Sequence, residues 1–411
     1  MTGLPRRDLL RSVAAAGFGV AAGAVGGWSA SRAFPVEAAA NGEPGTAWET
    51  PAPGAFARVD PHGAHQAGID RPSTPQAHEV VTVLDLPDVP AADGADETFR
   101  SGLREMLAHL GELITALVEP GPDGESARSS AGMFEGPRDL TVTVGLGPRV
   151  LAALDSSLPG AEPLPAFAGD ARLPAERSGG DLLIAVCSSD VNDAAAASRA
   201  LIARSGAVPR WAQRGFRGVG KGTVARSPIG FLDGIIVPHG DREMSEHVWI
   251  ADGPLAGGTI CVIRRLRIDI ERFRALAQPQ QEGVVGRRRG DGSPLSGGAP
   301  DDEVDLLAKT PEGEFVIPAR SHVRAAHPSF TGSALMLRRG YGFDDGMAAD
   351  GTADAGLLFT CFQRDLRTFV QTQHRLDEVD DLMGFTTTTA SASFAILPGF
   401  SDRRRLGSTL V

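Results

Sequence analysis

Hydrophobic positions after about residue 77 follow two periods, and the two alternate along the chain. Apolar runs of four to ten residues, some alternating with polar positions, are typical of strands, and longer stretches with a period near 3.6 are typical of helices. In the first part the pattern predicts strands at 78–86, 140–145 and 182–187, and helices at 96–118 and 190–204. Asp190 or Asn192 is the expected cap of the last helix.

The same succession of elements returns in the second part. The pattern predicts strands at 247–250, 258–267, 335–337, 357–362 and 391–397, and helices at 269–277 and 365–376. The segments 182–190 and 357–365 look like copies, since each is an apolar strand that contains a cysteine and leads through an aspartate into a helix. This repetition indicates duplication of one α+β unit. Antiparallel pairing within each unit would give two ferredoxin-like halves.

The N-terminus has the order of a signal peptide. Arg6 and Arg7 precede an uncharged run of small residues at 12–27, and an alanine-rich cleavage region follows at 36–40. The arginine pair predicts export by the twin-arginine route, which carries folded proteins, to the cell envelope or the outside. A membrane anchor is the alternative, but the run is shorter than the roughly 20 apolar residues a spanning helix needs, so no lasting membrane insertion is expected.

These features divide the chain into four parts. We predict a signal peptide at 1–40, an extended segment rich in Gly, Pro and Ala at 41–77, a first domain at 78–240 and a second at 241–411. The formal net charge of −11 argues against nucleic acid as a partner. The basic run Gly286–Arg289 is interpreted as a solvated loop. The 3 cysteines are far apart, which argues against a disulfide framework or a cysteine metal site and favours buried, inert thiols.

Three polar segments carry the candidate chemistry. They are Gly230-Phe231-Leu232-Asp233-Gly234, Ser321-His322-Val323-Arg324 and Leu337-Arg338-Arg339-Gly340-Tyr341. An acid between glycines, a histidine in a basic segment and an arginine shortly after are the polar groups that a haem peroxidase needs. In this order and spacing they resemble the dye-decolourising peroxidases. The resemblance covers most of the chain after about residue 60, including His65–Ile69 and Gly286–Leu295, which are similar to other segments of that family.

The resemblance implies a two-half α+β architecture like a dimeric α+β barrel, with one haem b per chain in the C-terminal half. By its match to the family segment, His322 is the expected proximal ligand of the haem iron. None of the 9 histidines stands out on the residues alone, and His327 is the main rival. The order of the strands makes Asp365 the candidate carboxylate that accepts the other imidazole N–H. Arg324 is expected either to pair with a haem propionate or to be a solvated arginine.

On the distal side the family pattern assigns proton transfer to Asp233 and charge stabilisation to Arg338, chosen over Arg339. Gly234, with Gly230, allows the backbone to turn closely over the flat ring. Where the family has polar residues this chain has Ile235-Ile236-Val237, which predicts a more apolar distal side. Burial would raise the pKa of Asp233 and Arg338 would lower it. This predicts an activity that rises toward acidic pH.

The function implied is a haem-dependent peroxidase that reduces hydrogen peroxide and oxidises dyes, phenols or similar donors. Release of iron from haem, the activity for which some exported relatives are called deferrochelatases, would use the same residues. A non-enzymatic exported haem-binding protein is the third possibility. Because a pocket of this kind is expected to exclude bulky dyes, electrons would leave through Trp211, Trp249 or Tyr341, and Tyr341 is the candidate radical site. Family members often self-associate, so a homo-oligomer is also possible.

Overall fold

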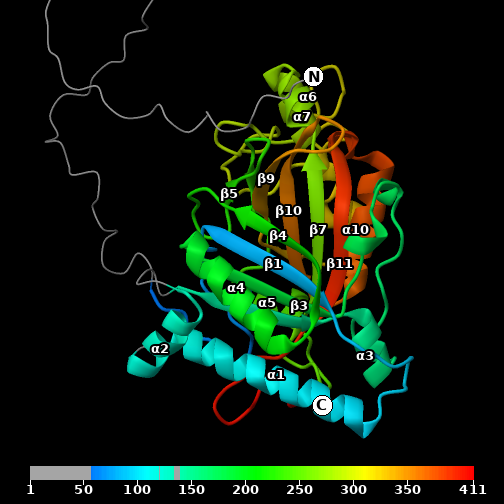
Figure 1. Cartoon of the computed structure of the whole chain (residues 1–411). Helices are drawn as coiled ribbons and strands as arrows, with labels where there is room; N and C mark the ends of the chain where they lie inside the picture. The colour runs from blue at the N-terminus through cyan, green and yellow to red at the C-terminus, as the bar shows by residue number, and fades with distance from the viewer. Residues whose placement is uncertain (1–56, 120, 134–138) are drawn as a thin grey trace, which may run out of the picture. The chain divides into compact units, whose positions relative to one another are not determined.

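The computed structural model describes residues 57–119, 121–133 and 139–411 (Figure 1). The expected signal peptide, with Arg6 and Arg7, lies outside the described residues. These described residues belong to one compact unit. No helix among the described residues is both long and apolar enough to span a bilayer.

The first half contains two strand–helix–strand units. Its elements are β1 (His78–Asp85), α1 (Glu97–Val118), β2 (Thr141–Leu146), β3 (Leu182–Ser188), α4 (Val191–Ser205) and β4 (Val208–Phe216). The strands lie in the order β2-β3-β1-β4 and pair antiparallel, which is the ferredoxin-like arrangement. The helices α1 and α4 pack on each other and cover one face of these strands (Figure 1).

The second half repeats this order. It contains β7 (Thr259–Ile268), β9 (Tyr341–Met347), β10 (Ala353–Gln363), α10 (Leu366–Val379) and β11 (Thr386–Ile396), with strand order β9-β10-β7-β11. The predicted copies are therefore confirmed as equivalent elements, because β3 and β10 each lead into a helix. Asp190 caps α4 by accepting hydrogen bonds from the N–H groups of Asn192 and Asp193, and Asp365 caps α10 in the same way.

The two half-sheets join at both edges. β11 pairs with β2 through Ala395 and Ile396, and β4 pairs with β9 between Phe216 and Gly342. β7 and β10 also pair, so the ring of strands closes. The enclosed apolar core draws on both halves and includes Val81, Val83, Tyr341, Phe343 and Phe394. The expected two-half α+β barrel is thereby confirmed.

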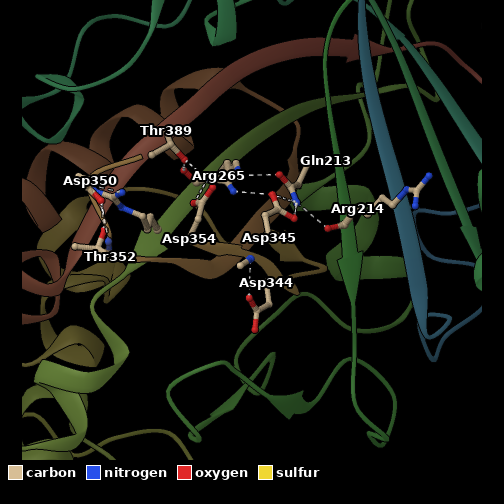
Figure 2. Close-up of polar contacts among 11 residues, drawn as sticks. Gln213, Arg214, Arg265, Asp344, Asp345, Asp350, Thr352, Asp354 and Thr389 are labelled. Atoms are coloured by element: carbon tan, nitrogen blue, oxygen red, sulfur yellow. Dashed lines mark hydrogen bonds and ion pairs between the residues drawn. The ribbon is translucent and has the colours of Figure 1, made fainter. Parts of the chain in front are cut away.

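A buried arginine joins the strands near the β4–β9 contact. Arg265, on β7, has a side chain that is 1% exposed and donates to Gln213 Oε1 on β4 at 2.6 Å and to Thr389 Oγ1 on β11 at 2.7 Å. It also pairs with Asp345 and Asp354 from the hairpin of β9 and β10, each at 2.9 Å (Figure 2). Since these groups come from strands of both halves, the network ties the halves together.

Short elements fill the connections, and most of them were not predicted. They are α2 (Pro122–Ser130), α3 (Pro148–Leu154), β5 (Ala225–Arg226), β6 (Leu232–Asp233), α5 (Gly240–His247), α6 (Ile270–Arg274), α7 (Gln278–Val285), α8 (His322–Ala325), α9 (Pro328–Thr331), β8 (Leu337–Arg338) and the 3₁₀ turns η1 (Ala168–Asp170), η2 (Ala175–Arg177) and η3 (Asp381–Phe385). The strand predicted at 247–250 is wrong. His247 ends α5, and the apolar residues that follow are buried without a strand partner.

Candidate active site

A cavity of about 270 Å³ lies in the second half and collects the main candidate residues. His322 from α8, Asp233 from β6 and Arg338 from β8 all line it. Most of its wall is apolar, with contributions from β7, β10 and α10. The apolar lining residues include Leu266, Ile268, Met336, Leu357, Phe359, Phe369 and Leu376.

The His322 side chain is held from one side only. Its Nδ1 lies 2.6 Å from Oδ2 of Asp380, whose side chain is fully buried where α10 ends. Burial alone would lower the pKa of His322, but the Asp380 carboxylate raises it above the ordinary value through its charge and hydrogen bond. Nε2 makes no hydrogen bond with any described residue, and the ring remains 38% exposed in the cavity. One ring nitrogen is therefore oriented and the other is available to a ligand.

Both ring nitrogens of His327, the alternative ligand, already have hydrogen-bond partners. His327 also lines the cavity, but its Nδ1 accepts from the N–H of Ser329 at 3.1 Å, and its Nε2 lies 2.9 Å from Oε1 of Glu303. A ring bonded at both nitrogens has no lone pair left for a metal. Hydrogen bonding therefore favours His322 over His327 as a ligand.

Asp233 and Arg338 form an ion pair on the cavity wall. Arg338 donates from Nη2 and Nε to Oδ1 of Asp233 at 3.1 and 3.3 Å, and from Nη1 to the carbonyl of Ile236 at 2.9 Å. Oδ1 also accepts the N–H of Gly234 at 2.6 Å. Burial alone would raise the pKa of Asp233, but Arg338 and the Gly234 amide outweigh it and hold this pKa below the ordinary value. The carboxylate is thus kept ionised next to a fixed cation.

Gly234 is needed for the shape of this turn. Its φ is +85°, and a Cβ at this position would lie 2.2 Å from the carbonyl oxygen of Thr223. Ile235 and Ile236, which replace polar residues of the family pattern, both line the cavity. The expectation of an apolar surface next to the distal acid is thereby met.

Two sequence assignments require correction. Asp365 is not near His322: it caps α10, and its Oδ2 bonds to Arg367 at 2.6 Å. The carboxylate that accepts from His322 is Asp380, at the opposite end of the same helix. Arg324 points away from the cavity, since it donates to the carbonyls of Ile317 and Leu306. A chain position cannot show which end of a helix faces a ligand, and this is why Asp365 was chosen instead of Asp380. Arg324 is neither solvated nor part of the cavity wall, because its guanidinium is used on backbone carbonyls.

The structure brings a different arginine to the cavity. Arg287, in the run interpreted as a solvated loop, lines the cavity and is only 5% exposed. It donates to the carbonyls of Gly292, Pro300 and Asp302, and it makes no ion pair with a described carboxylate. Burial lowers its pKa. The Arg-rich loop was the sequence signal that could have found it.

The aromatic residues considered for electron exit are all buried. Trp211, Trp249 and Tyr341 are 6%, 7% and 1% exposed. Trp249 stacks on His65, with ring centroids 3.7 Å apart. Tyr341 donates its O–H to Cys187 Sγ at 3.7 Å, and burial raises its pKa. Direct contact between Tyr341 and a bulky donor is therefore excluded by its burial.

Fold and site together define an α+β barrel protein with a histidine-anchored cavity that faces an Asp–Arg pair. Comparison with known proteins identifies the family. Residues 66–217 match the Dyp-type peroxidase N-terminal model, and residues 224–401 match the Dyp-type peroxidase C-terminal model. The chain belongs to the Dyp-type peroxidase family, and it is a haem peroxidase.

Relatives align along most of their length. The dye-decolorizing peroxidase of Thermobifida fusca (strain YX) is 35% identical over 86% of this chain and 85% of its own. A deferrochelatase of Escherichia coli (strain UTI89 / UPEC) is 32% identical over 85% of this chain and 86% of its own. The structure of ferric DtpA from Streptomyces lividans superimposes with a TM-score of 0.75 at 34% identity, covering 86% of this chain and 97% of that one.

The cofactor is haem, and the cavity suits it. Its wall is largely apolar, as a porphyrin face requires, and His322 presents an imidazole nitrogen that no described residue occupies. Arg287 offers a cation that has no described carboxylate partner. The donor set and the lining therefore fit a histidine-ligated haem.

Proposed function

We propose that His322 is the proximal iron ligand of this peroxidase and that Asp233 and Arg338 activate hydrogen peroxide. The observation that carries this proposal is the shared cavity: one imidazole nitrogen and one Asp–Arg pair, from three separate elements, line the same space. Gly234 shapes the turn that presents Asp233, and Arg287 takes the role of propionate partner that the sequence suggested for Arg324.

Asp233 and Arg338 have different tasks in the reaction with peroxide. When bound, haem supplies the iron that exchanges electrons with peroxide and with the donor. Asp233, ionised in the resting protein, takes a proton from one peroxide oxygen and delivers it to the other, which leaves as water. Arg338 fixes the carboxylate through two N–H groups and places positive charge where negative charge develops on the leaving oxygen.

Asp380 has the matching task on the proximal side. Its buried carboxylate accepts the Nδ1 proton of His322, which fixes the tautomer so that Nε2 faces the cavity. The same bond gives the ring imidazolate character and makes Nε2 a stronger electron donor to a metal.

The deciding experiment is a visible absorption spectrum of the purified protein before and after one equivalent of hydrogen peroxide. We expect a Soret band that shifts within seconds in the wild type and is lost in His322→Ala. Asp233→Asn should keep the band and slow the shift by about 100- to 10,000-fold, the usual contribution of a general acid–base group. A rapid shift in Asp233→Asn would disprove its role, and an unchanged resting spectrum in His322→Ala would disprove iron ligation by His322.

Iron release remains a second candidate because a relative at 32% identity is called a deferrochelatase. The two activities differ in product, since iron release yields a metal-free porphyrin. Incubating the haem-loaded protein with a reductant and an Fe²⁺ chelator distinguishes them. Porphyrin fluorescence would support iron release. An intact haem spectrum would argue against iron release and leave peroxidase activity as the function.

We further propose that the protein is exported through the twin-arginine route and works outside the cytoplasm. The support is the sequence of residues 1–40, with Arg6 and Arg7 before a short uncharged run. Replacing both arginines by lysine should leave active enzyme in the cytoplasmic fraction. Unchanged export of the double variant would contradict the proposal.

Donor oxidation through Tyr341 and self-association are also proposals. Tyr341 is the sole tyrosine of the chain, so a tyrosyl radical seen after peroxide treatment has a single possible source. Unchanged turnover of a bulky dye by Tyr341→Phe would eliminate this route. Sedimentation of the haem-loaded protein measures the oligomeric state directly.

A further inference from the structure

We infer that Arg217, which belongs to the first half, is the positioning residue that fixes the distal Asp233–Arg338 pair in the second half. This inference rests on the proposed roles of Asp233 and Arg338. Arg217 does not line the large cavity, so it acts through the backbone segments that carry the pair.

The main chain of Arg217 is held by the sheet. Phe216, just before it, ends β4 and pairs with His78 of β1 on one side and Gly342 of β9 on the other. The N–H of Arg217 donates to the carbonyl of Ala77 at 2.8 Å. The backbone of Arg217 is therefore held in place where the sheets of the two halves meet.

The Arg217 guanidinium joins the two segments that carry the distal residues. Its Nη1 donates to the carbonyl of Gly340, two residues after Arg338, at 3.1 Å. Its Nη2 donates to the carbonyl of Thr223. Thr223 in turn donates from Oγ1 to the carbonyl of Gly234 at 2.8 Å. One planar side chain thus connects the Arg338 segment to the Asp233 turn.

The contacts around this connection are close. A Cβ on Gly234 would meet the carbonyl oxygen of Thr223 at 2.2 Å, so the turn and the Thr223 segment are in direct contact. Arg217, Thr223, Asp233, Arg338 and Gly340 together line a second, small cavity of about 20 Å³, with space for about one water molecule. The side chains of Arg338 and Asp233 are 26% and 36% exposed.

Arginine suits this task better than lysine. Its rigid fork can donate to two carbonyls from different segments at once, whereas the single ammonium of lysine cannot hold the same geometry. Loss of the fork should let the two segments shift relative to each other. A misplacement of about 1 Å can cost about 100-fold in rate. The reaction with peroxide should therefore suffer, while the later oxidation of the donor should not.

The test compares Arg217→Gln, Arg217→Lys and Thr223→Val with wild type, all fully loaded with haem as judged by the Soret band. Arg210→Gln is the matched control, because Arg210 lies on β4, the strand that Arg217 directly follows, and also donates to carbonyls, those of Ala175 and Ser178, away from the cavity. Two quantities are measured: the second-order rate constant with hydrogen peroxide, separately from donor oxidation, and amide hydrogen exchange in peptides covering 223–236 and 338–342.

We expect Arg217→Gln to lower the peroxide rate constant by about 10- to 100-fold and to speed exchange in both peptides. Arg217→Lys should recover part of the rate, Thr223→Val should give a smaller loss with faster exchange at 223–236, and the Arg210 control should change neither quantity.

A peroxide rate constant within about twofold of wild type in Arg217→Gln would overturn the inference. So would a slower rate with unchanged exchange, since the effect would then be one of charge and not of position. Asp233→Asn separates this inference from the proposed function. If that variant reacts normally with peroxide, the roles of the pair fail, while the exchange data on Arg217→Gln still decide whether Arg217 holds it in place.

Discussion

Asp380 and Asp233 have different environments because their hydrogen-bond partners differ. Asp380 lies 2.6 Å from Nδ1 of His322 and orients that ring, whereas Asp233 accepts from the Arg338 cation and the Gly234 amide and stays ionised. In each case the neighbouring donor, and not the carboxylate itself, sets the chemical role.

Asp380→Asn should weaken electron donation by His322 without causing loss of haem. The amide cannot make the ring imidazolate-like, so we expect haem to remain bound and the reaction with peroxide to slow by about 10- to 100-fold. Stopped-flow absorption measures the rate. Asp381→Asn is the control, since Asp381 is 46% exposed and pairs with Arg320. Equal rates in the two variants would refute the role of Asp380.

The pH dependence of the peroxide reaction should report Asp233. Because the pKa of Asp233 is held below the ordinary value of about 3.9, the carboxylate stays ionised through neutral and mildly acidic pH. We expect a constant rate from neutral pH down to about pH 4 and a fall below it, as the ion pair with Arg338 is lost on protonation. The rise toward acid expected from the sequence does not follow from a lowered pKa. A stopped-flow profile that already falls above pH 5 would contradict this assignment.

At the scale of elements, the turn between β6 and the Ile235-Ile236 segment brings Asp233 into the cavity. Glycine is required there on two grounds, a left-handed φ and contact with a neighbouring carbonyl.

Gly234→Ala should therefore cost more than an ordinary glycine substitution. We expect a loss of about 1–3 kcal/mol in unfolding free energy together with slower reaction with peroxide. Gly206→Ala is a matched control, since Gly206 also has a positive φ, at the end of α4, but a Cβ there would meet nothing within 4 Å. Denaturant melts compare the two variants. A cost for Gly234→Ala no larger than that of Gly206→Ala would show that the contact with Thr223 is unimportant.

The network around Arg265 is the second feature at this scale. Arg265→Met removes the hydrogen bonds to Gln213 and Thr389 and both ion pairs, and it should lower the unfolding free energy by about 1–3 kcal/mol. The cost is limited because Asp345 and Asp354 are partly exposed and can be hydrated. Arg267→Met, on the same strand, breaks one ion pair with a half-exposed Asp350 and should cost less than about 1 kcal/mol. Similar melting temperatures for the two variants would argue against a tie between the halves.

At the scale of the whole molecule, the halves share one closed sheet and one core. Separating them would expose the edges of β11, β2, β4 and β9 and the apolar core residues between them.

We therefore expect residues 224–411 alone to aggregate, although they carry every residue proposed to contact haem or peroxide. The chain from residue 41 onward is the control and should be soluble, with a single unfolding transition. Size-exclusion chromatography and thermal melts distinguish the outcomes. A soluble, haem-binding fragment 224–411 would show that the halves are independent domains.

The period of the hydrophobic pattern was sufficient to predict most long elements, because burial on one face leaves a local record in the sequence. It placed the helices 96–118 and 190–204 and the strand 182–187 within a few residues. It failed at 247–250, where an apolar run is buried in a loop, and at β4 and β9, where glycine and charged residues interrupt the pattern. The predicted boundary between domains at 240/241 stays a prediction.

Sequence alone determined the repeated α+β unit and the family, and it singled out the residues of the three polar motifs. Each of these features can be recognised in short stretches of the amino-acid sequence. Only the tertiary structure decided which side chains meet. It placed Asp380, and not Asp365, beside His322, and it placed Arg287, and not Arg324, in the cavity wall. It also brought Arg217 from the first half close to the segments of Asp233 and Arg338. The physical reason is that such contacts join segments up to about a hundred and twenty residues apart, and their geometry depends on how the sheet closes, which no single segment encodes.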